Sequence, residues 1–242
     1  MQYGTRTYGL GAIALGLVGL AFADFALQWQ PVPKGIPAHT VLAYLSGAIL
    51  LLSGAALFTR RWAALGALTL AVFFGFWVIA LHGPIAAAKP AFFAVWQGVA
   101  EILGLSMAGL IAWAMTGPLT APRAERVIRL GRIVFALCLL VFGVSHFVYA
   151  KFTAALTPAY LPPGPLFWTY ATGCAHIAAG LALLSGIQAR LASRLLTVMF
   201  ALFAMLVHAP LVLADPSKHL NWLGLTITLA LTGAAWVVAD SV

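Results

Sequence analysis

Apolar residues fill most of this chain in long continuous runs, which short polar or proline-rich segments separate. A membrane-spanning helix needs about 20 apolar residues, and eight runs meet that length: Leu10–Trp29, Val41–Phe58, Trp62–Leu81, Phe92–Met115, Leu130–Ala150, Phe167–Ile187, Leu191–Leu213 and Leu220–Ala239. Apolar and polar positions do not alternate inside the runs, so they predict helices rather than the strands of a barrel. The pattern predicts an all-α polytopic membrane protein with eight transmembrane helices.

Composition narrows the function classes. Hydrophobic residues make up 63% of the 242 residues and charged residues only 7%, whereas a soluble domain carries about 25% charged residues. A soluble enzyme, a disordered chain and a nucleic-acid-binding protein are therefore excluded, and the lipid bilayer is the expected surrounding. Cys138 and Cys174 lie inside apolar runs and predict neither a disulfide framework nor a metal site.

The basic residues divide unequally between the two sets of connecting segments. One set, with both termini, holds nine arginines, and the other holds four lysines: Arg6, Arg60, Arg61, Arg123, Arg126, Arg129, Arg132, Arg190 and Arg194 against Lys34, Lys89, Lys151 and Lys218. Arginine and lysine concentrate on the cytoplasmic side of membrane proteins. We therefore expect both termini in the cytoplasm, in a membrane such as the bacterial inner membrane.

The chain aligns with itself at an offset of 126 residues, which indicates a duplication. The aligned pairs include Tyr44 with Tyr170, Gly47 with Gly173, Gly54 with Gly180, His82 with His208, Pro84 with Pro210 and Trp96 with Trp222. We expect residues 1–117 and 131–242 to form two four-helix repeats joined by a cytoplasmic linker at 118–130. Four spans in each half predict parallel repeats, with a ligand site between them. Ala21-Phe22-Ala23 imitates a signal-peptide cleavage site, but the first span has a counterpart in the second half, so we expect it to remain.

Several motifs resemble those of the DoxX-like family of small membrane proteins. They are Gly143-Val144-Ser145-His146-Phe147, the proline-rich segment that follows, Tyr170-Ala171-Thr172-Gly173 and Gly180. The resemblance covers most of Leu130–Ala239 and, more weakly, Leu10–Met115. It implies a four-helix unit, and some members of the family are membrane subunits of quinone-linked sulfur oxidation. This chain departs from the family by carrying two fused units.

Four ionisable residues fall inside the predicted spans, where each is costly. Asp24, Glu101, His146 and His176 lie near the middle or in the outer half of the bilayer, and Gln97 precedes Glu101 by one helical turn. Gathering them in one polar pocket would let them satisfy one another. They form either a structural knot, such as an Asp24–His146 pair, or a catalytic proton relay or substrate site.

His82 and His208 are the candidate cofactor ligands, with Trp96 and Trp222 beside them. Both histidines precede a proline-containing dipeptide where a helix is expected to stop, so capping of the helix end explains them without a ligand. Alternatively, the pair faces across the repeat axis and holds a quinone or, less favoured, a haem iron. The tryptophans also suit an interfacial belt. His39 and His219 are expected to be solvated interface residues, and no metal-binding histidine spacing is present.

Three functions compete. We favour an integral membrane subunit that is redox-linked and binds a quinone-like apolar ring in the outer half of the bilayer. The alternatives are a small-solute carrier that uses the repeat interface and a non-enzymatic scaffold that anchors a partner protein. The residues leave open whether the chain is itself an enzyme.

Overall fold

The computed structural model describes residues 2–242, and that range contains helices and no strand. Eight helical segments within it are long and apolar enough to cross a membrane. The eight spans are α1 (Tyr3–Phe22), α2 (His39–Ala56), α3 (Ala63–Trp77) continued by η2 (Val78–His82) and α4 (Gly83–Ala88), α5 (Phe93–Thr116), α6 (Ala121–Val148), α8 (Pro165–Ser185), α9 (Ala189–Phe203) continued by η3 (Ala204–His208) and α10 (Ala209–Ala214), and α11 (His219–Asp240). The all-α polytopic membrane fold is confirmed.

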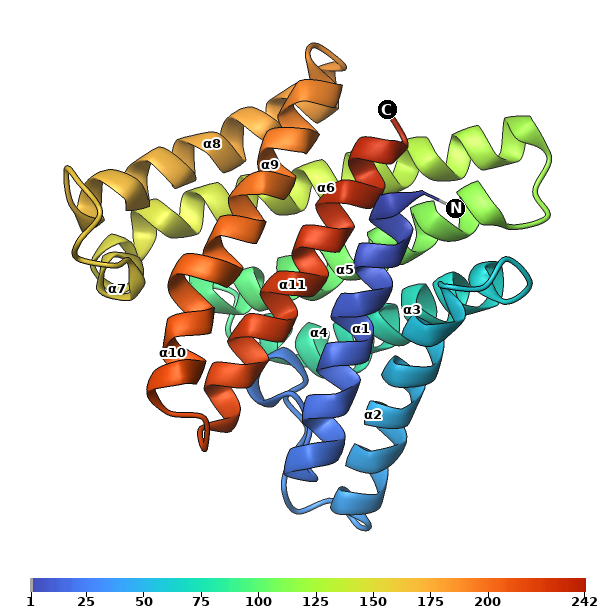
Figure 1. Cartoon of the computed structure of the whole chain (residues 1–242), viewed down its shortest axis with the longest axis horizontal. Helices are drawn as coiled ribbons and strands as arrows, with labels where there is room; N and C mark the ends of the chain where they lie inside the picture. The colour runs from blue at the N-terminus through green and yellow to red at the C-terminus, as the bar shows by residue number, and fades with distance from the viewer. Residues whose placement is uncertain (1) are drawn as a thin grey trace.

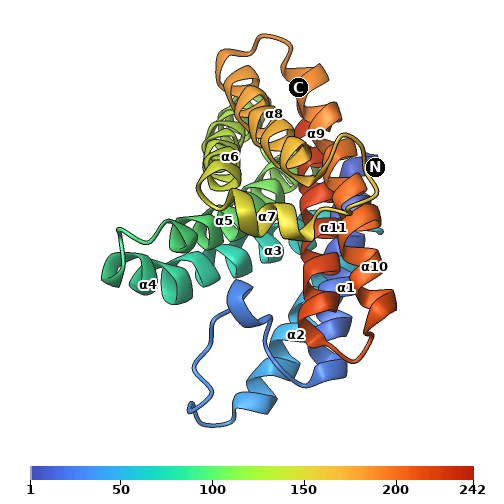
Figure 2. The same cartoon turned by 90° about the vertical axis from the view of Figure 1, so that its left-hand side faces the viewer.

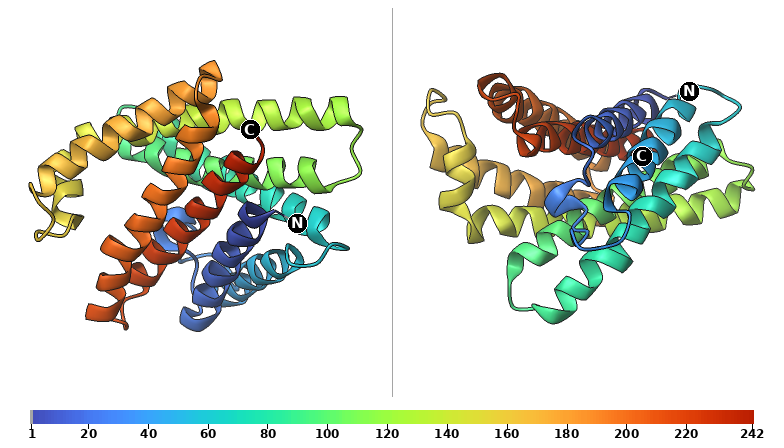
Figure 3. Two further views of the ribbon diagram at one scale, coloured as in Figure 1. Left: turned by 45° about the horizontal axis from the view of Figure 1, so that its top comes forward. Right: turned by 90° about the horizontal axis from the view of Figure 1, so that it is seen from below.

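The spans pack in two layers of four that lie across one another (Figures 1 and 2). Neighbours follow the order α2, α1, α11, α9 in one layer and α8, α6, α5, α3 in the other. The layers meet where α11 lies on α5, α2 on α3 and α9 on α8, and Figure 3 shows the same stacking from below. Each layer therefore combines two of the first four spans of the chain with two of the last four.

Corresponding elements begin 126 residues apart in the two halves. The helix starts pair as His39 with Pro165, Ala63 with Ala189 and Phe93 with His219. The π-helical segments η2 and η3 show the same spacing. In Figure 1 the α2–α3 and α5–α6 connections lie at the right and the α8–α9 connection at the top, with both termini between them, whereas the α7–α8 loop lies at the left and the α10–α11 loop at the lower left.

Glycines bring the backbones of neighbouring spans into close contact. A Cβ atom on Gly16 would lie 2.6 Å from the Gly47 carbonyl oxygen, and one on Gly54 would lie 2.6 Å from the Gly9 carbonyl oxygen. Small residues at helix interfaces allow this approach in membranes, where van der Waals packing stabilises helix pairs. These contacts fix α1 against α2.

The first helix ends earlier in the chain than its apolar run, Leu10–Trp29, predicts. α1 ends at Phe22, and Ala23 takes a left-handed conformation with φ 53°. Residues 23–38 then form a loop that folds back into the protein around the short turn η1 (Leu27–Trp29), burying Phe25, Trp29 and Gln30. Asp24 consequently lies in this loop rather than inside a span, which removes the cost of a mid-helix carboxylate.

The third and seventh spans continue where the sequence predicted a stop. Each passes through its histidine and proline to Ala88 or Ala214 by way of the π-helical segment. Proline lacks an N–H group and clashes with the preceding turn of an α-helix, and the wider π turn relieves that clash. His82 and His208 are therefore inside helical segments, so capping of a helix end does not explain them.

Two further elements lie between the spans. α6 begins at Ala121 with Pro122 in its first turn, so most of the expected linker at 118–130 is helical. The short helix α7 (Ala150–Leu156) follows α6 and has no buried residue.

Candidate functional site

Two histidines from neighbouring helices of one layer lie side by side. His146 on α6 and His176 on α8 have ring centroids 5.0 Å apart. His146 Nδ1 is 2.7 Å from the Phe142 carbonyl oxygen, and His176 Nδ1 is 2.8 Å from the Thr172 carbonyl oxygen. A carbonyl oxygen can only accept, so Nδ1 carries the proton on each ring. In the neutral rings, both Nε2 atoms are left as hydrogen-bond acceptors.

Aromatic rings surround this pair. Phe142, Phe200 and Phe203 lie 5.7, 5.5 and 6.2 Å from the His176 ring, between centroids. His176 is 1% exposed, and its buried Nε2 atom has no hydrogen-bond partner among the described residues. A buried polar atom without a partner costs about 1–3 kcal/mol. The His176 Nε2 atom can thus still accept a hydrogen bond from a donor group.

The lipid-facing side of the same helices gives access to the pair. His146 is only half-buried. Beside it, the rings of Phe147 and Tyr170 are stacked with centroids 5.6 Å apart, and both are exposed. His146 thus lies next to an exposed pair of stacked aromatic rings.

Glu101 on α5 is held in a second group. Its Oε2 atom accepts from Trp29 Nε1, and its Oε1 atom accepts from Gln97 Nε2 at 2.8 Å. Trp29 also provides its carbonyl oxygen to His82, whose Nε2 atom lies 2.9 Å away. The turn η1 is consequently fixed by its indole to α5 and by its backbone to η2.

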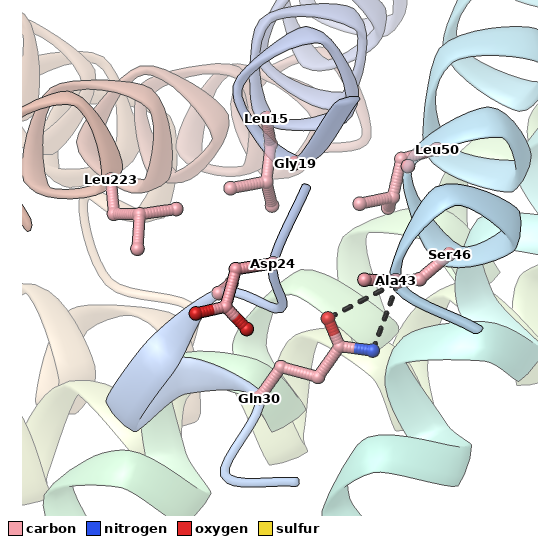
Figure 4. Close-up of a pocket in the computed structure, with 10 residues that line it drawn as sticks. Leu15, Gly19, Asp24, Gln30, Ala43, Ser46, Leu50 and Leu223 are labelled. Carbon is pink, nitrogen blue, oxygen red and sulfur yellow. Dashed lines mark hydrogen bonds between the residues drawn. The ribbon is translucent and has the colours of Figure 1, made fainter. Parts of the chain in front are cut away.

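Asp24 lines a small, mostly apolar cavity under the first loop (Figure 4). Asp24 Oδ1 accepts from the Phe25 N–H at 2.8 Å and lies 3.8 Å from His39 Nε2. Gln30 and Ser46 are hydrogen-bonded to each other on the opposite wall, at 2.9 Å from amide nitrogen to hydroxyl oxygen. The cavity has a volume of about 10 Å³, which admits about one water molecule.

The structure thus separates the four ionisable residues that the sequence placed in one pocket. It brings His146 and His176 together, whereas Glu101 is hydrogen-bonded to Trp29 and Gln97 and Asp24 lies beside His39. The Asp24–His146 pair is not the ion pair that forms. The physical reason is that α1 ends at Phe22, so Asp24 follows the path of the loop.

His82 and His208 occupy equivalent places on two different helices. The His82 ring packs on Gly98 of α5, and the His208 ring packs on Gly224 of α11, where a Cβ atom would lie 2.7 Å from His208 Nδ1. Each ring thus packs on its own helix, α5 or α11, and no ring contact between the two histidines is found among the described residues.

Trp96 and Trp222 use their indole N–H groups to hold the preceding loops. Trp96 Nε1 donates to the Pro90 carbonyl oxygen at 2.9 Å, and Trp222 Nε1 donates to the Pro216 carbonyl oxygen at 2.8 Å. Trp168 repeats the bond with Pro162 at 3.0 Å. A proline six residues before each tryptophan is the sequence signal shared by all three bonds.

The histidines at the loop–helix junctions are half-buried among aromatic rings. The His39 ring meets the edge of Phe25, and the His219 ring stacks on Phe22 with centroids 4.4 Å apart. The sequence did not indicate the roles of Trp29, Gln30 and Ser46, because these roles depend on how the first loop folds back. Within residues 2–242, no group of three or more His, Cys, Asp or Glu residues is arranged to hold a metal ion.

Comparison with known protein families gives one match. Residues 127–209 match the model of the DoxX family. This part of the chain is similar to the DoxX family. No curated protein and no solved structure matched the chain.

The matched range begins within α6 and reaches the start of α10, so it includes His146, His176 and the three phenylalanines around them. The resemblance to DoxX-like proteins is confirmed over this range. Together with the eight apolar helices, it shows an integral membrane protein.

Proposed function

We propose that this protein is the integral membrane subunit of a redox-linked system and binds the quinol form of a quinone-like ring at the His146–His176 pair. The observation that carries the proposal is the pair of adjacent imidazoles whose Nε2 atoms are free to accept. We place this pair in the outer half of the bilayer, with both termini in the cytoplasm, on the basis of the arginine distribution.

The residues present suit such a ring. A quinol supplies two O–H donors and, on oxidation, two electrons and two protons. His146 Nε2 and His176 Nε2 accept hydrogen bonds from O–H groups, and the backbone bonds at Nδ1 keep both rings in the accepting tautomer. Phe142, Phe200 and Phe203 exclude water. The electrons would leave to a partner protein subunit.

Haem does not fit the residues at hand. His82 and His208 pack on separate glycines, and the 5.0 Å between the His146 and His176 rings leaves no room for a porphyrin between them. We accordingly expect the purified protein to show no Soret band.

The direct test is binding of a short-chain quinol, decylubiquinol, to the purified protein in detergent. An asparagine amide reproduces the Nδ1 donor of histidine but lacks Nε2, so His176→Asn keeps the bond to Thr172 and removes the acceptor. We expect His176→Asn to weaken binding at least about tenfold, which is the worth of one hydrogen bond of roughly 1.4 kcal/mol.

His39→Asn is the matched control, since it removes a half-buried histidine outside the pair, and it should bind like the wild type. Equal binding by His176→Asn and the wild type would contradict the proposal. A copurifying quinone, identified by chromatography, would support it independently.

We also infer that the protein is two fused four-helix units, 1–117 and 131–242, of which the second contains most of the range that matches the DoxX family. The matching helix starts, the paired π segments and the two Trp–Pro bonds support this. Glu101 and His176 correspond to Ile227 and Leu50 under the offset. Glu101 and His176 thus each occur in only one unit, which favours sites that differ between the two units.

A small-solute carrier is the second candidate. Interruptions at corresponding positions of two repeats mark the binding site in many transporters, and η2 and η3 interrupt the third and seventh spans in this way. A protein that retains no quinone and gains no thermal stability from added quinol would favour the carrier, or the scaffold that anchors a partner protein.

A further inference from the structure

A groove opens between α6 and α8 at the end of the bundle opposite the lysine-bearing loops. Its volume is about 230 Å³, and it is lined by Arg129, Arg132, Ile133, Leu183, Leu184, Ser185 and Gly186. Arg129 and Arg132 are three residues apart on α6, so they share one helix face. The groove therefore places two guanidinium groups beside an apolar wall.

The positive charge in the groove has no carboxylate partner. The two ion pairs found within residues 2–242 are His39–Asp24 and Lys218–Asp215, both at the opposite end. Glu125, one turn before Arg129, makes no ion pair with it. Arg132 donates to the Ser241 carbonyl oxygen at 3.2 Å, which uses one of its several N–H groups. Both arginines keep donors for an anion.

The C-terminal end of α8 does not cancel this charge. A helix C-terminus carries about half a negative charge, and Gly186 already caps α8 by donating to the Ala182 carbonyl oxygen at 2.9 Å. Two full positive charges exceed that half charge. The two guanidinium groups thus outweigh the partial charge of the helix end.

The apolar wall distinguishes a lipid from a free anion. Ile133 and Leu184 are each 40% exposed at the groove, and Leu183 is buried behind them. An inorganic phosphate gains nothing from these side chains, whereas an acyl chain covers them. Basic grooves between spanning helices are a recurrent site for anionic lipid headgroups.

The geometry points to a binding site for one anionic phospholipid in this groove. The phosphate accepts hydrogen bonds from Arg129 and Arg132, and an acyl chain lies along Ile133 and Leu184. The bound lipid links α6 to α8, the two helices that carry His146 and His176, although the assignment does not depend on quinol binding.

Native mass spectrometry of the purified protein with phosphatidylglycerol or phosphatidylcholine tests the site. We expect the wild type to retain one phosphatidylglycerol and little phosphatidylcholine. Arg129→Gln combined with Arg132→Gln should lower phosphatidylglycerol retention at least about fivefold. Arg60→Gln combined with Arg61→Gln removes the same charge from the same end outside the groove and should retain lipid like the wild type.

A single variant and a phosphate control complete the experiment. Arg129→Gln alone disturbs no described hydrogen bond, so it replaces the double variant if that one fails to fold, and it should still lower retention. Inorganic phosphate should leave the melting temperature unchanged where phosphatidylglycerol raises it. Equal retention of the two lipids, equal loss in the Arg60 and Arg61 control, or equal stabilisation by phosphate would overturn the assignment.

Discussion

Glu101 shows how single polar side chains are accommodated in this apolar bundle. Both of its carboxyl oxygens accept hydrogen bonds, one from Trp29 and one from Gln97. The Gln97 Oε1 atom is buried and has no partner among the described residues. A glutamine at position 101 could therefore accept from Trp29 through its oxygen and donate to Gln97, once the Gln97 amide turns over.

We predict that Glu101→Gln folds with nearly wild-type stability, whereas Glu101→Leu is destabilised. Leucine leaves the Trp29 indole N–H and the Gln97 amide buried without an acceptor, at about 1–3 kcal/mol for each group. Thermal unfolding in detergent, followed by tryptophan fluorescence, measures the difference.

The proposed redox activity, measured for the Glu101→Gln variant, then distinguishes a proton-relay role of Glu101 from a structural one. A folded but inactive Glu101→Gln protein would indicate that the carboxyl group transfers protons, and a folded active one would indicate a structural role. Unfolding of Glu101→Gln would show that Gln97 cannot turn over.

At the scale of elements, glycine contacts decide which spans can lie together. Gly54 on α2 faces the backbone of α1, whereas Gly104 on α5 faces the ring of Phe135. The difference gives the same substitution opposite effects on two helices.

We predict that Gly54→Ala lowers stability by about 1–3 kcal/mol, because its Cβ atom would lie 2.6 Å from the Gly9 carbonyl oxygen. Gly104→Ala is the control: its Cβ atom would lie 3.6 Å from the Phe135 ring, an ordinary contact. Alanine favours the helix by about 1 kcal/mol over glycine, so this variant should melt at or above the wild-type temperature. Equal melting temperatures for the two variants would show that α1 and α2 can separate.

For the whole molecule, the interleaved layers bring the two ends of the chain together. α1 packs on α11, and the Gly4 N–H donates to Asp240 Oδ2 at 2.9 Å. Arg132 and Arg190 donate to the carbonyl oxygens of Ser241 and Val242. The residues near both termini thus lie on the arginine-rich face.

We predict that this face is cytoplasmic. In intact cells, cysteines placed at Gln2 and Ser241 should escape a membrane-impermeant thiol reagent, and a cysteine at Thr157, after α7, should react. A background without Cys174, which is exposed, keeps the readout clean. Labelling of the terminal positions from outside would reverse the orientation.

The sequence by itself determined the membrane class, the eight spans and the DoxX resemblance. These properties follow from local composition: a run of about 20 apolar residues is stable as a helix in lipid whatever its neighbours are. The sequence could also mark His146 and His176 as costly residues that need a reason, because burial of an imidazole is unfavourable anywhere in a span.

Only the tertiary structure decided which residues meet. Glu101 accepts a hydrogen bond from Trp29, which lies 72 residues earlier in the chain. Asp24 lies close to His39 because α1 ends early and the loop folds back. The sequence indicates which two halves repeat, whereas only the structure shows that each layer takes two spans from each half. In lipid, apolar faces attract one another with little selectivity, so close glycine packing and the few polar groups select the partners, and their geometry appears only in the assembled bundle.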